Sequence, residues 1–169
     1  TRCSRDWSSD VCSSDLYRGS THRLCRCSPD QVARYRARLS GPLLDRIDLH
    51  VDVGWQSAQA VHEAPPGESS ATVQARCVAA RDRAFQRQAC LNHTLSPSQL
   101  HSMPIASAAQ QCLQQAAARW GWSTRQSHRT IKVARTIADL AGCDLIGLDH
   151  LAEALQYRDT SSDLGDHPA

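Results

Sequence analysis

Apolar and polar positions recur at helical spacing through most of the second half of the chain. They predict helices over about residues 70–89, 107–120, 123–142 and 148–157, with a shorter helix opening at Ser96. This pattern predicts an α-helical bundle over residues 68–158.

The first half combines one helix with one alternating segment. Ser28 is a good N-cap and Gln31 completes a capping-box pattern, so we expect a helix from there to about Leu39. Residues 47–53 alternate Ile, Leu and Val with Asp and His, which predicts a strand with one buried face. Residues 54–67 are rich in Pro and Gly near their end and are expected to be a linker.

The two ends of the chain lack these patterns. Residues 1–16 have neither a helical nor a strand period and nearly repeat the triplet Ser-Ser-Asp, so we expect a non-native leader there. A native disordered leader is the alternative. Residues 159–169 carry Asp but no Lys or Arg and are expected to be a disordered tail.

Composition narrows the class of protein. The 169 residues, 41% of them hydrophobic, suffice for one domain or two small ones. The net charge is +2, and Lys132 is the only lysine; Arg suits phosphate contacts, although a GC-rich genome would give the same bias. Eight cysteines could indicate disulfides, but half of them (Cys77, Cys90, Cys112 and Cys143) lie singly in or at the ends of helical patterns, where free Cys acts as a small hydrophobe. With no visible secretory signal or membrane-length apolar run, we expect a reduced, cytoplasmic protein without a membrane partner.

Arg46 stands directly before the predicted strand. An arginine fixed there could act as an arginine finger, which stabilises charge on a phosphoryl group bound by a neighbouring subunit. The alternative is a structural ion pair with Asp30, Asp45 or Asp48.

A basic stripe is predicted on the helix over 123–142. Arg125, Arg129 and Lys132 share one face of that helix. The stripe is either a solvated face or an anion site, because a cation in the first helical turn is disfavoured unless an anion lies nearby. The residues expected to be buried on this helix are Thr130, Ile131, Ala134, Ile137, Ala138, Leu140 and Ala141.

Two weaker candidates lie near the predicted first helix. Cys25 and Cys27 form half of a possible zinc site, which normally needs four ligands; two exposed thiols are the alternative. Arg34, Arg36 and Arg38 form a basic run that could contact nucleic acid or could be an ordinary exposed helix face.

The sequence contains no Gly-x-x-x-x-Gly-Lys-Ser/Thr loop for cradling phosphates. It also contains no apolar strand ending in paired acids that would hold Mg²⁺. We therefore expect this chain by itself neither to bind ATP tightly nor to hydrolyse it.

Several motifs together resemble the C-terminal part of the magnesium-chelatase-like AAA+ ATPases, the YifB/ComM group. The similarity runs from Tyr17 to Arg158. The motifs are residues 25–31 (CRCSPDQ), 40–51 (SGPLLDRIDLHV), 123–125 (STR), 133–142 (VARTIADLAG) and 150–158 (HLAEALQYR).

The resemblance implies a mainly α fold, in which residues 17–53 hold the last strand and a flanking helix of an AAA+ α/β core and residues 68–158 form an α-helical lid. It makes Arg46 the arginine finger and Arg125 the sensor-2 arginine. Arg129, on the same basic stripe as Arg125, is a second nucleotide-binding candidate. The second half of the family's cysteine cluster would precede Tyr17 and is absent here, so no metal is expected.

The same resemblance implies ATP and Mg²⁺ as cofactors of a longer parent protein. Its partners would be DNA and the other subunits of a homo-oligomeric ring with six members. ComM-type members of the family would drive branch migration in natural transformation. The alternatives are a stand-alone helical module that binds nucleic acid and an inactive truncated gene product.

Overall fold

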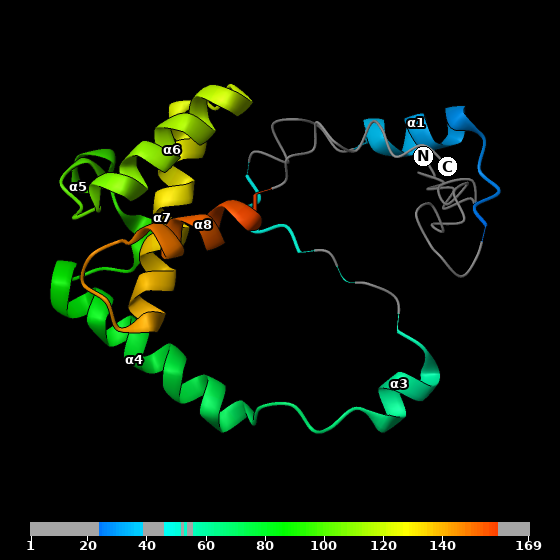
Figure 1. Ribbon diagram of the computed structural model, residues 1–169, viewed down its shortest axis with the longest axis horizontal. Helices are drawn as coiled ribbons and strands as arrows, with labels where there is room; N and C mark the ends of the chain where they lie inside the picture. The colour runs from blue at the N-terminus through cyan, green and yellow to red at the C-terminus, as the bar shows by residue number, and fades with distance from the viewer. Residues whose placement is uncertain (1–23, 39–45, 52, 54–55, 159–169) are drawn as a thin grey trace, which may run out of the picture. The chain divides into compact units, whose positions relative to one another are not determined.

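The computed structural model describes residues 24–38, 46–51, 53 and 56–158. The chain divides into two compact units, one made of residues 1–46 and 53–58 and the other of residues 47–52 and 59–169. The first unit contains α1 (Pro29–Ala37), and the short α3 (Ala58–Glu63) begins where the units meet along the chain. The second contains α4 (Ser70–Gln88), η2 (Asn92–Thr94), α5 (Pro97–His101), α6 (Ser107–Trp120), α7 (Thr124–Ala141) and α8 (Leu148–Gln156) (Figure 1).

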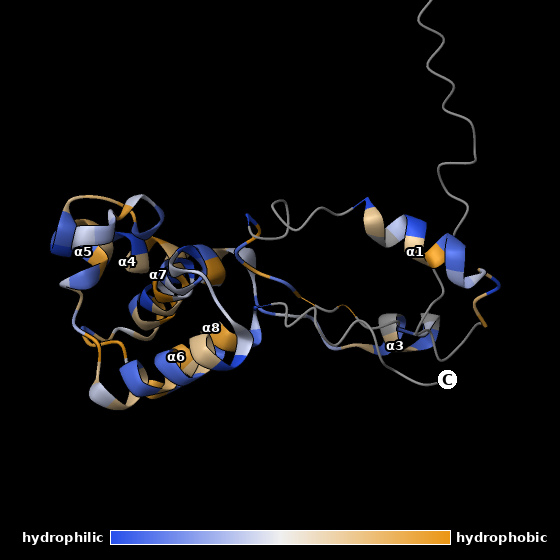
Figure 2. Ribbon diagram, turned by 90° about the horizontal axis from the view of Figure 1, so that it is seen from above, coloured by the Kyte–Doolittle hydropathy of each residue, from blue (hydrophilic) through white to orange (hydrophobic). Residues whose placement is uncertain are grey.

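Serine residues fix where α1, α4, α5 and α7 begin. At α1 the Ser28 N–H donates to Gln31 Oε1 at 2.8 Å, and the Gln31 N–H donates to Ser28 Oγ at 3.3 Å. The same capping box, which satisfies free backbone donors of the first turn, opens α5 at Ser96 and α7 at Ser123. The bounds of the helices agree nearly to the residue with the prediction, although α1 ends at Ala37 rather than Leu39. In Figure 2 these helices alternate between hydrophilic and hydrophobic stretches, as amphipathic helices do.

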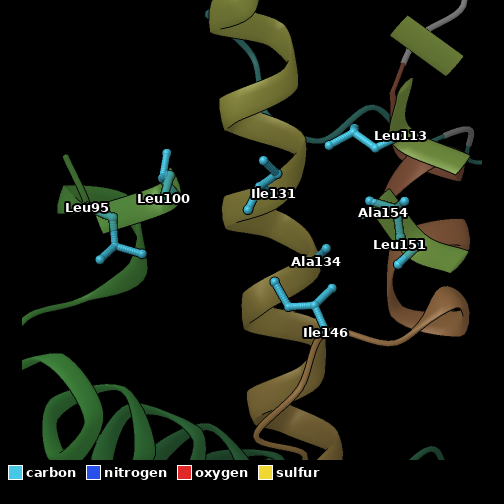
Figure 3. Packing of buried hydrophobic residues seen from close by; sticks show 9 residues of the cluster. Leu95, Leu100, Leu113, Ile131, Ala134, Ile146, Leu151 and Ala154 are labelled. Carbon is cyan, nitrogen blue, oxygen red and sulfur yellow. The ribbon is translucent and has the colours of Figure 1, made fainter. Parts of the chain in front are cut away.

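Helix α7 is the centre of the second unit and packs against α4, η2, α5 and α8. Figure 3 shows Leu95 and Leu100 on one side of α7, with Leu113, Leu151 and Ala154 on the other. All of these side chains are buried. The remaining members of this core are Ala109, Ile131, Ala134 and Ile146. Burying apolar area on both sides of one helix fixes its orientation, and this holds the polar residues of α7 in place.

A short backbone bridge joins the loops before α6 and before α8. Ile105 and Ile146 form an isolated parallel bridge, with Ala106 N–H donating to Ile146 O at 3.0 Å and Ile146 N–H donating to Pro104 O at 3.1 Å. The Ile146 side chain is only 1% exposed. This contact therefore anchors the start of α8 to the core.

The expected strand over 47–53 is wrong for the described part of that segment. Residues 47–51 and 53 form no strand, and their apolar side chains are exposed, from 38% for Ile47 to 90% for Val53. A strand needs a neighbouring strand for its hydrogen-bond ladder, and the described residues provide none. The backbone of 47–50 is bound instead to the end of α8: His50 N–H donates to Tyr157 O at 2.8 Å, and Arg158 Nη1 donates to Ile47 O at 3.3 Å.

Two further expectations need correction or refinement. Leu140 is 40% exposed and Ala141 is exposed, because the last turn of α7 extends past the packed core. The expected linker over 54–67 contains the short helix α3. None of the described helices has both the length and the apolar character needed to cross a bilayer.

Candidate functional site

Arg125 lies in the first turn of α7, directly after the Ser123 capping box. In this cap the Ser123 N–H donates to Gln126 Oε1 at 2.8 Å, which sets the direction in which the helix starts. No acidic residue occupies this turn. The positive end of the helix dipole and the Arg125 guanidinium therefore add at the same place, which favours an anion there.

Arg125 stands at a cavity of about 890 Å³ beside α7. The volume falls within the range of small-molecule sites. Its lining comes from residues 48–49, η2, α5, α7 and α8, all within the second unit. The apolar part of the lining is Leu49, Leu95, Pro97, Leu100, Val133, Ile137 and Leu140, and the basic part is His93, Arg125, His128, Arg129 and Lys132.

The three permanent cations of this cavity differ in their partners. Arg129 forms an ion pair with Asp48, and its side chain is only 19% exposed. Lys132 Nζ donates to the His93 carbonyl at 2.9 Å. For Arg125, which is exposed, the described part of the chain supplies no hydrogen-bond or ion-pair partner.

This arrangement separates the members of the predicted basic stripe. The structure brings Arg125 and Arg129 to one cavity, but Arg129 has a carboxylate partner and Arg125 has none among the described residues. A guanidinium with its donors unused can bind a phosphate in a bidentate manner. Arg125 is therefore the better anion-binding candidate of the two.

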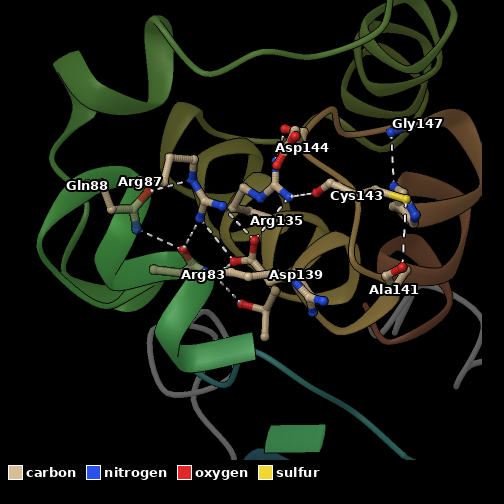
Figure 4. A network of polar contacts seen from close by, with 12 residues as sticks. Arg83, Arg87, Gln88, Arg135, Asp139, Ala141, Cys143, Asp144 and Gly147 are labelled. Carbon is tan, nitrogen blue, oxygen red and sulfur yellow. Dashed lines mark hydrogen bonds and ion pairs between the residues drawn. The ribbon is translucent and has the colours of Figure 1, made fainter. Parts of the chain in front are cut away.

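A buried charge network lies elsewhere on α7, against α4, and the sequence pattern missed it (Figure 4). Asp139 accepts hydrogen bonds from Arg87 at 2.6 and 3.0 Å, from Asn92 at 2.8 Å and from Arg135 at 3.1 Å. The exposed fractions of the Asp139 and Arg135 side chains are 1% and 0%. Arg83 Nη1 also donates to the Asp139 carbonyl at 2.8 Å, so two arginines of α4 hold the end of α7.

Burial and pairing act in opposite directions on the pKa values of this network. Burial alone would raise the pKa of the Asp139 carboxyl, but the hydrogen bonds from Arg87 and Asn92 and the charges of Arg135 and Arg87 outweigh it, so that pKa is lowered. Burial lowers the pKa of the Arg135 guanidinium, and Asp139 offsets part of this effect. Arg135 also donates to the carbonyls of Cys143 and Asp144, so the network fixes the chain as it leaves α7.

The sequence contained one sign of this network, the Arg135–Asp139 spacing of i and i+4. That spacing is common on solvated helices, and it does not indicate burial. Only the packing of α4 against α7 turns the pair into part of the interior.

Arg46 is exposed and belongs to the first unit. Asp48, one of the carboxylates considered as its structural partner, is in an ion pair with Arg129. The finger role of Arg46 stays a prediction.

The other predicted residues of the first unit also stay predictions. Arg34 and Arg38 on and beside α1 are exposed, Arg34 Nε donates to the Asp30 carbonyl at 3.4 Å, and the Arg36 side chain lies outside the described residues. Cys25 and Cys27 are half-buried, so the alternative of two exposed thiols is not what the structure shows. No group of three or more possible metal ligands gathers among the residues that the structure describes.

Two family models match the chain. The model described as magnesium chelatase, subunit ChlI C-terminal, matches residues 67–158, and the one described as magnesium chelatase, subunit ChlI, matches residues 8–61. The second match includes residues 8–16, which lie outside the described residues. Together the matches confirm the resemblance that the motifs indicated.

Curated relatives give the same result. The uncharacterized protein YifB of Escherichia coli strain K12 is 45% identical over 139 residues, which are 79% of this chain and 27% of that protein. The competence protein ComM of Haemophilus influenzae is 38% identical over 135 residues, 79% of this chain and 26% of ComM. The uncharacterized protein Mb2921c of Mycobacterium bovis is 38% identical over 145 residues, 82% of this chain and 28% of that protein. The chain thus spans little more than a quarter of the length of these relatives.

Proposed function

The chain belongs to the magnesium chelatase subunit ChlI family, and from that premise we propose that it supplies the helical lid of an ATP-driven ring motor, with Arg125 binding the nucleotide phosphates. The described helices of the second unit would form the lid. ATP and Mg²⁺ would be bound mainly by parts of a longer protein, because this sequence has no phosphate-binding loop. The ring would be a homohexamer that acts on DNA.

One observation carries this proposal: Arg125 has no partner among the described residues although it stands at a cavity whose other permanent cations are engaged. An exposed arginine in the first turn of a helix is electrostatically unfavourable unless an anion compensates it. A nucleotide phosphate would supply that compensation, and the guanidinium can bind two of its oxygens at once. Arg129 would act indirectly, by holding Asp48 and the segment that contains it against α7.

Arg46 has a separate role in the proposal. It would reach the nucleotide of the neighbouring subunit and stabilise charge that develops on the transferred phosphoryl group, an effect worth on the order of 10³-fold or more in rate. Its position directly before residues 47–51, which are bound to the end of α8, would couple that contact to the lid.

A chimera tests the Arg125 role. The homologous residues of this chain replace the matched 139 residues of the E. coli relative, which supplies the upstream part, and ATP turnover and nucleotide affinity are measured. We expect Arg125→Ala to lower turnover, nucleotide affinity or both by about 10- to 100-fold, the effect of losing one charged hydrogen-bond donor to a phosphate. The matched control is Arg81→Ala, an exposed arginine on α4 that does not line the cavity. Equal, small effects of both substitutions in folded protein would refute the role of Arg125.

A mixing experiment with the same chimera tests Arg46. Arg46→Ala should cut turnover strongly and leave nucleotide affinity nearly unchanged. Mixing it with a subunit that keeps Arg46 but cannot bind nucleotide should restore part of the activity, because some interfaces then pair a working finger with a working nucleotide site. No rescue in rings shown to be mixed would refute action across subunits.

A further inference from the structure

We propose that the corner where α6 meets α7 binds single-stranded nucleic acid, with a base stacked on Trp120 and a phosphate held by Arg119. We call Arg119, Trp120, Gly121 and Trp122 the tryptophan corner. It is separate from the cavity at Arg125, since none of its residues lines that cavity. The inference deepens the proposed function by naming where nucleic acid would bind, and it rests on DNA as the partner of that function.

The backbone conformation of Gly121 creates the corner. Gly121 has φ +62°, a left-handed conformation that suits glycine, and it ends α6. The turn brings the rings of Trp120 and Trp122 to a centroid distance of 5.2 Å with an interplanar angle of 32°. Apart from Gly121 itself and its two neighbours in the chain, no heavy atom lies within 4 Å of a Cβ built on Gly121, so the backbone of the corner is open to solvent at this residue.

The two rings have different surroundings. Trp122 packs against the hydrophobic core, and the Arg158 guanidinium, 5.8 Å from its ring centroid, belongs to a residue that is only 8% exposed. Trp120 is not part of that core, and the guanidinium at 6.0 Å from its centroid is that of Arg119, which is exposed. Both tryptophans are partly buried. Trp122 is the structural support, because it packs against the core, whereas Trp120 is backed by Trp122 and has its remaining exposed area available to a ligand.

The charge of the surrounding chain fits a polyanion. Residues 83–138, which include η2, α5, α6 and most of α7, contain no Asp or Glu. Helix α6 has Gln residues and Arg119 as its polar and charged side chains besides Ser107. Proteins that bind single strands without reading sequence combine a positively charged groove with aromatic rings on which bases stack, and this acid-free stretch of chain, with Arg119 beside Trp120, fits that combination. A double helix keeps its bases stacked on one another, so it cannot offer one to Trp120.

The test measures binding by the full chain of a fluorescein-labelled oligothymidylate of about 20 nucleotides, a length that spans more than one stacking site. Fluorescence anisotropy is recorded across a salt series, with oligouridylate and a duplex of equal length as further arms. We expect Trp120→Ala to weaken binding of the single strand roughly 5- to 100-fold, the loss of one stacked base, and Trp120→Phe to retain most of the affinity. Arg119→Ala should lower the slope of log K against log salt by about 0.7, one phosphate contact on a single strand.

The control is again Arg81→Ala, which removes an exposed arginine of α4 and should change neither affinity nor slope. Comparable binding of oligothymidylate and oligouridylate would assign the site to single strands in general, as proposed. Equal affinity for the duplex, equal effects of Arg119→Ala and Arg81→Ala, or unchanged binding in a folded Trp120→Ala variant would each overturn the proposal. If Trp120→Ala does not fold, the Arg119 and Trp120→Phe measurements decide. ATP turnover is not a readout here, so this inference can fail while the role of Arg125 stands.

Discussion

The charge network between α4 and α7 should dominate the stability of the helical unit, and Asp139→Asn is the substitution that tests this. The substitution keeps the shape of the side chain but removes its charge. Asp139 then no longer neutralises Arg135, which is fully buried, or Arg87, whose side chain is 22% exposed. Removing one partner of a buried ion pair costs about 3–5 kcal/mol, because the remaining charge stays in the interior without compensation.

The expected loss is therefore a large part of the whole free energy of unfolding, which for domains of this size is about 5–15 kcal/mol. Urea unfolding followed by far-UV circular dichroism measures it, and the thermal midpoint should fall by roughly 10 °C or more. Asp82→Asn is the matched control, since Asp82 is an exposed carboxylate of α4, and it should change stability by less than about 0.5 kcal/mol. If Asp139→Asn destabilised the protein no more than Asp82→Asn, the network would not hold the helices together.

Two other predictions concern pH and the core. The folded pKa of Asp139 lies below its unfolded value of about 3.9, so its contribution to stability is present above that pH and is lost as the pH falls further. In Asp139→Asn the free energy of unfolding should therefore fall less steeply below about pH 4, and an unchanged pH dependence there would argue against this cause. Ile131→Ala should cost about 2–5 kcal/mol, because that side chain is 8% exposed, whereas Leu140→Ala should cost clearly less, because Leu140 is 40% exposed; chemical denaturation of the two variants gives the order, and the reverse order would place the core on the wrong side of α7.

The order and bounds of the helices are determined by local sequence. Ser28, Ser96 and Ser123 are each followed three residues later by Gln and each form a capping box; the box was predicted at Ser28, and a helix start was predicted at the other two. Gly121 and Gly142 end α6 and α7 with positive φ. Capping and helical periodicity act over a few neighbouring residues, so a sequence carries them without knowledge of the fold. The family motifs were readable for the same reason, as continuous stretches of chain.

Tertiary structure alone decided which polar residues work together. Arg129 and Asp48 are 81 positions apart in the chain, and Arg87 and Asp139 are 52 apart. The helical spacing grouped Arg125, Arg129 and Lys132 as one stripe, but contacts from other segments gave Arg129 and Lys132 partners and supplied none to Arg125 among the described residues. The described residues of the alternating segment, 47–51 and 53, form no strand for the same physical reason. Alternation determines which side chains share a face, whereas a hydrogen-bond ladder requires a partner strand, just as an ion pair requires a partner from another part of the molecule.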